Sequence, residues 1–104
     1  MSHSSTILES VNIREQHLNR VKVFRALGDE TRLSMVRLLR DAGGAMACAT
    51  LVQACHTTRT AASYHYKELE GAGLIIRRRD GQGVTVVLNT KVLAREFAGL
   101  LRCL

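Results

Sequence analysis

Hydrogen-bonding side chains crowd the stretch between residues 58 and 65 of this 104-residue chain. Hydroxyl, guanidinium and imidazole groups at this density can bond to base edges and phosphate oxygens. A helix that only faced water would more often carry Glu/Lys pairs there. The composition therefore favours contact with nucleic acid, and it favours a DNA contact over metal binding for the one histidine. The expected contacts are Thr58, Arg59, Thr60, Ser63, Tyr64 and His65.

Three consecutive arginines follow at positions 77 to 79. Side chains alternate along a strand, so Arg77 and Arg79 share one face while Arg78 takes the other. If residues 58–65 begin a helix that contacts base edges, which we call the reading helix, a basic β-loop beside it can reach phosphates or the minor groove. This adds the three arginines and Gln82 to the expected DNA contacts. Charged edge strands also discourage aggregation between sheets, and the two roles are compatible.

Cys48, Cys55 and Cys103 are the remaining reactive groups. An odd number of cysteines does not make a secreted disulfide framework. Cys48 and Cys55 share a helix face but stand ~10.5 Å apart along it, which is too far for one ion with thiolate bonds of ~2.3 Å. A site would need Cys103, for example from a partner subunit. Three interpretations stay open: the cysteines are small buried hydrophobic residues, they form a thiol sensor of a thiophilic metal, metalloid or oxidant, or the protein responds to another kind of inducer. Apart from such an inducer, no cofactor is expected.

The charge of the chain is strongly basic. Fifteen basic and nine acidic residues give a net charge of +6, and a small basic domain attracts polyanions, most often nucleic acid. No apolar run approaches the ~18 residues of a membrane helix, and the polar N-terminus has no apolar leader. We expect a cytoplasmic protein with double-stranded DNA as its partner and no membrane. A nucleophile elbow, a phosphate loop and a zinc-protease motif are all absent, so an enzyme is not expected.

The spacing of apolar residues places these groups on a mostly helical chain. Asp29 is expected to cap one helix, Thr57 or Thr58 the reading helix, and Asn89 or Thr90 the last helix. Gly43 and Gly44 end the helix that begins after Asp29. The expected helices span 7–18 with a continuation through 21–26, about 30–40, 48–55, about 58–70, and about 90–104.

After residue 73 the spacing of the apolar residues changes from the helical period to a pattern typical of strands. Leu74–Arg79 and Val84–Leu88 are β-rich runs on either side of a glycine-containing loop, which predicts a hairpin. Two short helices joined by a turn precede it, the arrangement of a helix-turn-helix. The predicted fold is therefore mostly α with a β-hairpin wing: a winged helix-turn-helix of five helices and a two-stranded wing. Residues 1–6 are expected to form a disordered tail and residues 7–104 a single domain.

Two segments resemble the ArsR/SmtB family of metalloregulatory repressors. FRALGDETRL, residues 24–33, is similar to the opening signature of that family. SYHYKEL, residues 63–69, followed by AGLI, residues 72–75, resembles its recognition helix and the start of its wing. The likeness covers about residues 20 to 90. It implies a winged-helix homodimer that binds an imperfect palindrome near its own promoter and is released by an inducer.

The resemblance does not carry over the known metal sites of that family. Ala47-Cys48-Ala49 stands where the arsenic and cadmium sensors have Cys-Val-Cys, and Asn89-Thr90-Lys91 replaces the Asp-x-His of the zinc sensors. The resemblance does imply that the terminal helices, about 7–19 and 90–104, form the dimer interface, which agrees with the apolar last helix. The expected interface residues are Leu8, Val11, Leu93, Phe97, Leu100, Leu101 and Leu104.

These features predict a sequence-specific DNA-binding transcriptional repressor of the ArsR type, acting as a homodimer. Two alternatives stay open. One is a winged helix used for protein–protein assembly, whose positive charge would meet an acidic partner. The other is DNA binding that needs no inducer.

Overall fold

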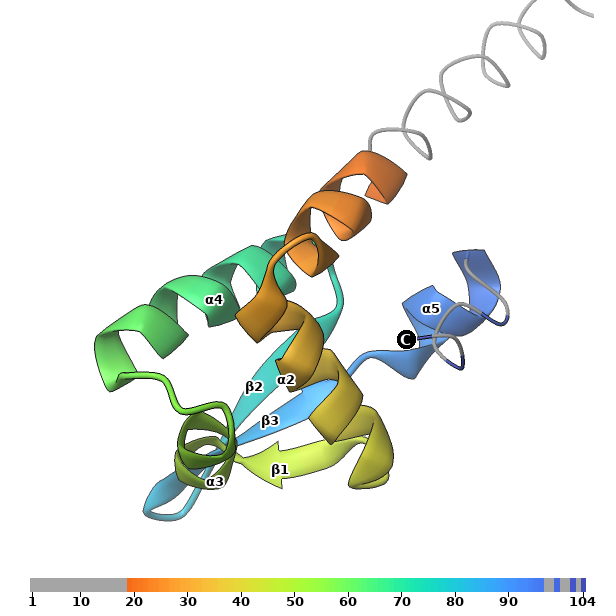
Figure 1. The fold of residues 1–104 in the computed structure, drawn as a ribbon. Helices are drawn as coiled ribbons and strands as arrows, with labels where there is room; N and C mark the ends of the chain where they lie inside the picture. The colour runs from red at the N-terminus through yellow and green to blue at the C-terminus, as the bar shows by residue number, and fades with distance from the viewer. Residues whose placement is uncertain (1–18, 97–98, 100–101, 103) are drawn as a thin grey trace, which may run out of the picture.

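The computed structural model describes residues 19–96, 99, 102 and 104. The expectations for the N-terminal tail and for residues 7–18 lie outside these residues. Within the described part, no helix combines the length and apolar character that crossing a membrane requires. Residues 19–27 are helical, and the elements that follow are α2 (Glu30–Asp41), β1 (Ala45–Ala47), α3 (Cys48–Ala54), α4 (Arg59–Gly71), β2 (Ile75–Asp80), β3 (Gly83–Leu88) and α5 (Thr90–Glu96) (Figure 1).

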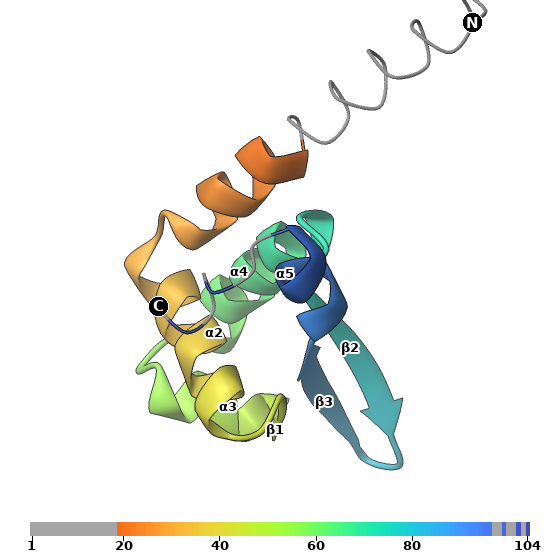
Figure 2. The ribbon, with the colours of Figure 1, turned by 90° about the vertical axis from the view of Figure 1, so that its right-hand side faces the viewer.

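A three-stranded antiparallel sheet in the order β1-β3-β2 supports the helices. Helices α2 and α3 contact the central strand β3, and α4 contacts β2. The β2–β3 hairpin extends past the helices as a wing (Figure 2). The winged helix-turn-helix predicted from the sequence, five helices with a hairpin before the last, is confirmed. Strand β1 was missed, since its three residues, AMA, are not typical of strands.

The core lies between α2, α4 and the inner face of the sheet. Its members are mostly aliphatic, and Tyr66 of α4 is its aromatic member. Leu93 of α5 is only 1% exposed and belongs to this core. The assignment of Leu93 to a dimer interface is therefore wrong, because its side chain is already buried within its own chain. Leu104 is half-buried against the core, and the other expected interface residues lie outside the described part: Leu8, Val11, Phe97, Leu100 and Leu101.

Two of the predicted helix caps are present. Asp29 caps α2, where its Oδ2 accepts a hydrogen bond from the Arg32 backbone N–H at 3.0 Å. Thr58 caps α4, where its Oγ1 accepts from the Ala61 N–H at 3.1 Å. Helix α5 begins at Thr90, which puts Asn89 at the position before it.

Asp29→Ala is expected to lower the free energy of unfolding by about 1 kcal/mol at pH 7, the usual loss for a helix N-cap. The Arg32 backbone N–H is the main cause that lowers the pKa of Asp29. Because the folded pKa is the lower one, the charged cap stabilises the fold above the unfolded value of about 3.9, and this contribution is lost as pH falls through the folded pKa.

Urea unfolding at a series of pH values measures this contribution. The difference in the free energy of unfolding between wild type and Asp29→Ala should stay constant from pH 7 to about 5 and decrease below about 4. Asp29→Asn, which caps without charge, serves as the control. A gap that keeps its size down to pH 3 would rule out the charged cap.

Candidate nucleic-acid interface

The turn between α3 and α4 sets the direction of the reading helix. Helix α3 ends at Ala54, and Cys55 occupies its C-cap. His56 follows with φ of 52°, in the left-handed region that few non-glycine residues adopt, histidine among the more frequent. The chain thereby reverses within a few residues and enters α4 at the Thr58 cap. This is the turn of a helix-turn-helix.

The first turns of α4 present polar side chains to solvent. Thr58, Arg59 and Thr60 are exposed, Ser63 is half-buried, and Tyr64 is 58% exposed. The opposite side of the same helix is buried in the core through Ala62, Tyr66 and Leu69. One face of α4 is therefore fixed to the protein while the other carries hydrogen-bonding groups that a DNA groove can meet.

His65 does not belong to that exposed face. Its side chain is only 14% exposed, and its Nδ1 lies 3.2 Å from Arg32 Nη1 and 3.7 Å from Asp29 Oδ2. Because a guanidinium can only donate, Nδ1 is the acceptor in this hydrogen bond. The structure therefore does not favour the predicted DNA contact of His65, since its ring turns inward toward the start of α2.

Arg32 is the partner that sequence reasoning missed. It is 8% exposed, its Nε donates to the carbonyl oxygen of Ala26 at 2.6 Å, and its Nη2 donates to that of Arg25 at 3.5 Å. With the hydrogen bond to His65, one side chain joins the end of the helix at 19–27, the first turn of α2 and the middle of α4. We infer that Arg32 positions the reading helix relative to the helix at 19–27.

The wing arginines divide as the strand alternation predicts. Arg77 pairs with buried Val86, Arg78 with Thr85 and Arg79 with Val84, so Arg77 and Arg79 share the inner face and Arg78 takes the other. Arg78, Arg79 and the tip residue Gln82 are exposed.

Arg77 also holds the wing to α4. Its Nη2 lies 2.6 Å from the buried Oε1 of Glu70, and its guanidinium stacks 5.4 Å from the Tyr66 ring centroid. Both partners belong to α4. Arg77 therefore fixes the angle between the wing and the reading helix, and its charge is largely committed to Glu70.

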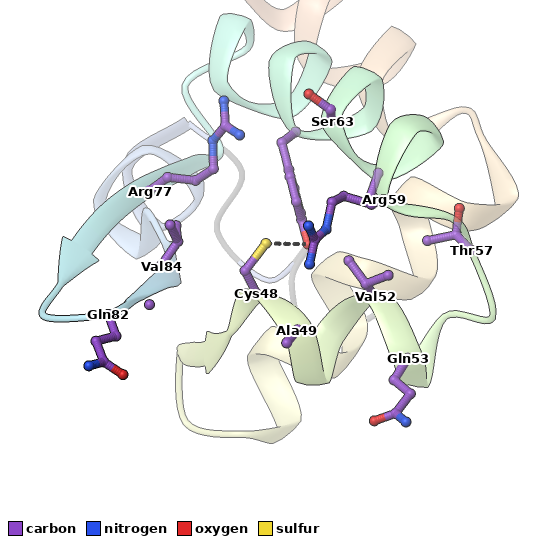
Figure 3. A pocket seen from close by; sticks show the side chains of 13 residues that line it. Cys48, Ala49, Val52, Gln53, Thr57, Arg59, Ser63, Arg77, Gln82 and Val84 are labelled. Atoms are coloured by element: carbon purple, nitrogen blue, oxygen red, sulfur yellow. Dashed lines mark hydrogen bonds between the residues drawn. The ribbon is translucent and has the colours of Figure 1, made fainter.

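A pocket of about 630 Å³ lies between α3, α4 and the wing (Figure 3). At its inner wall the Cys48 Sγ donates a hydrogen bond to Tyr66 Oη at 3.3 Å. Burial raises the pKa of Tyr66 well above its usual range. The phenol therefore stays neutral at physiological pH and gives the pocket a polar but uncharged floor.

The two described thiols, Cys48 and Cys55, are both half-buried and pack against the core. Burial raises the pKa of the Cys55 thiol, which lowers its thiolate fraction and its reactivity. Among the described residues, no three His, Cys, Asp or Glu side chains lie close enough to hold a metal ion. Cys103 lies outside the described residues, so a sensor that uses it stays a prediction. For Cys55 the structure favours the packing role.

Cys55 is expected to react with iodoacetamide several-fold more slowly in the folded protein than in the urea-unfolded chain at pH 7.5. The reason is the raised pKa, since only the thiolate attacks. The difference should decrease as pH rises and the folded thiol ionises. Peptide mass spectrometry follows the rate at Cys55 alone. Equal rates in the folded and unfolded chain would show that the fold neither buries this thiol nor raises its pKa.

In this structure α4, the second helix of the helix-turn-helix, begins with exposed polar side chains and is followed by an antiparallel hairpin. This arrangement defines the winged-helix class of DNA-binding proteins. Residues 19–78 match the helix-turn-helix domain family. The chain is 35% identical over 85 residues to the uncharacterized HTH-type transcriptional regulator YceK of Bacillus subtilis, covering 82% of this chain and 85% of that protein. The chain therefore belongs to the helix-turn-helix transcriptional regulators, and its type within them is that of ArsR.

Solved structures agree with this assignment. The homodimeric winged helix-turn-helix DNA-binding domain Mb0332 of Mycobacterium bovis is 25% identical, with a TM-score of 0.69, and the match covers 99% of this chain and 86% of that one. HlyU of Vibrio cholerae is 26% identical, with a TM-score of 0.68, over 85% of this chain and 96% of that one.

Proposed function

We propose that this regulator is a sequence-specific repressor that binds an imperfect palindrome in duplex DNA as a homodimer and is released by an inducer. The observation that carries the proposal is the exposed polar start of α4 beside the exposed arginines of the wing. Both surfaces are fixed to one rigid core, so they can meet a duplex together.

The two surfaces suit two different parts of DNA. A helix fits the major groove, about 12 Å wide, where an arginine can bond bidentately to guanine and hydroxyl groups can bond to other base edges. Arg59, Thr60 and Tyr64 are exposed residues in the first two turns of α4, the end that would enter the groove first. Arg78 and Arg79 lie on a separate element, where guanidinium groups can bind phosphates and set the register without reading sequence. The net charge of +6 would attract the protein to any duplex.

The dimer part of the proposal is supported by an apolar strip on the helix at 19–27. Val21 and Phe24, three residues apart on one helix face, are 37% and 55% exposed. This strip directly follows the segment expected to form the first helix of the dimer interface. The solved Mb0332 domain is itself described as homodimeric. A two-fold dimer would present its two α4 helices to half-sites about one helical turn apart.

Selection of bound sequences from random duplexes tests the proposal. We expect enrichment of an inverted repeat whose half-sites are separated by about 10 base pairs. Analytical ultracentrifugation of the complex should show two chains on each enriched duplex. Binding without any enrichment would instead support the assembly module, and enrichment of a single half-site by one chain would remove the homodimer.

A further inference from the structure

The pocket between α3, α4 and the wing is built like a site for a small molecule. Its volume of about 630 Å³ lies within the ~300–1,000 Å³ typical of ligand sites. The apolar part of its lining comes from all three elements: Ala49 and Val52 of α3, Ala62 and the Tyr66 ring of α4, and Val84 of β3. Such a lining can bury the apolar body of a ligand.

The charged side chains that line the pocket are both positive. Arg59 and Arg77 both line it, and none of its lining residues is acidic. Figure 3 shows the Arg59 side chain running from α4 across the pocket toward α3, opposite the wing. Glu70, which pairs with Arg77, is not among the lining residues. Because Glu70 pairs with Arg77, we assign the carboxylate to Arg59, and Ser63 and Gln82 can add hydrogen bonds.

We propose that this pocket binds a small organic carboxylate with an aromatic or aliphatic body, and that the bound molecule displaces DNA. The inference rests on the proposed function, because it supplies the inducer of that repressor. Arg59, Ser63 and Gln82 line the pocket and also belong to the expected DNA contacts. A carboxylate held by Arg59 removes that guanidinium from the groove. A ligand body between Val52 and Val84 also holds the wing tip at a distance from α3.

The competing occupant is a phosphate of the DNA backbone. A phosphate would use the same guanidinium groups but would gain nothing from the apolar lining. The probes are therefore 1-naphthoate, its neutral counterpart 1-naphthalenemethanol, and inorganic phosphate. We expect 1-naphthoate to bind saturably and to shift the amide NMR signals of α3, α4 and the wing tip. The neutral alcohol and phosphate should each bind at least about tenfold more weakly.

Ala49→Phe fills the pocket, and Ala54→Phe is its matched control. Both alanines are exposed residues of α3, but only Ala49 lines the pocket. The Kd for 1-naphthoate should rise at least about tenfold in Ala49→Phe and stay unchanged in Ala54→Phe. Val84→Phe fills the opposite wall and replaces Ala49→Phe if circular dichroism shows that the latter does not fold.

Fluorescence anisotropy with the selected duplex completes the test. With wild type and Ala54→Phe, 1-naphthoate should raise the apparent Kd for DNA about tenfold or more. Specific DNA binding with no 1-naphthoate binding would overturn the pocket proposal and leave the proposed function standing. Carboxylate binding that never affects DNA would overturn the inducer role. Phosphate binding as tight as 1-naphthoate would mark a backbone-phosphate site and overturn the ligand class. Failure of the proposed function would appear separately, as loss of sequence-specific binding before any probe is added.

Discussion

Arg32→Met is expected to lower the free energy of unfolding by about 2–3 kcal/mol, because it removes charge-assisted hydrogen bonds from a buried guanidinium. The Ala26 carbonyl, the Arg25 carbonyl and the His65 ring all lose the Arg32 donor, although the Arg25 carbonyl keeps the Gly28 backbone N–H at 3.3 Å. Methionine keeps much of the length and the helix propensity of arginine, so the loss reports the hydrogen bonds. Urea unfolding of the purified proteins measures it.

Arg37→Met is the matched control for this substitution. Arg37 lies on the same helix but is exposed to solvent, so its replacement should change the free energy of unfolding by no more than about 0.5 kcal/mol. His65→Gln keeps an acceptor for Arg32, whereas His65→Leu leaves Nη1 without one. We expect His65→Leu to be the more destabilising of the two by about 1 kcal/mol or more. Equal losses in Arg32→Met and Arg37→Met would refute the positioning role of Arg32.

Arg59→Ala is expected to weaken specific DNA binding by about 1–3 kcal/mol, if Arg59 reads a base as its place at the start of α4 indicates. Binding to a scrambled duplex should fall much less. The discrimination between the two duplexes is the informative quantity, since a phosphate contact would be lost equally from both. Anisotropy titrations with the selected and scrambled duplexes measure it.

The double variant Arg78→Ala/Arg79→Ala should behave differently. If both wing arginines bind phosphates, affinity falls for every sequence and the slope of log K against log salt decreases by about two. Arg37→Ala removes one exposed charge from α2, which is neither the reading helix nor the wing, and serves as the control. If the wing variant instead discriminates less between the selected and scrambled duplexes and keeps the wild-type salt slope, the wing reads the sequence. This result would contradict the phosphate-binding role assigned to the wing.

Local signals were enough to predict the parts that position the interface. Asp29 and Thr58 predict where their helices begin, because a short polar side chain before a stripe of apolar residues is a signal contained in the local sequence. The hairpin likewise depends on two β-rich runs and a glycine-containing loop. Strand β1 lacks any such signal, because its pairing with β3 is what makes those residues a strand.

The details of the site depend on contacts between distant segments. Arg32 has the helical spacing of the buried stripe that continues with Met35, Val36 and Leu39. Its charge nevertheless argues against burial when the sequence is considered alone. Only the fold brings it the partners that allow burial, which are His65 and the carbonyl groups of the preceding helix. The commitment of Arg77 to Glu70 across the wing is of the same kind. Leu93 shows the converse: periodicity identifies an apolar face but does not say whether its own core or a partner covers it.

Amide chemical-shift mapping of the ¹⁵N-labelled protein with the selected duplex most directly tests whether α4 and the wing are the DNA-binding surface. The largest changes should fall on residues 58–64 and 78–82, with little change at Arg37 on the outer side of α2. Changes confined to α2 or to the helix at 19–27, with residues 58–64 unaffected, would contradict the account.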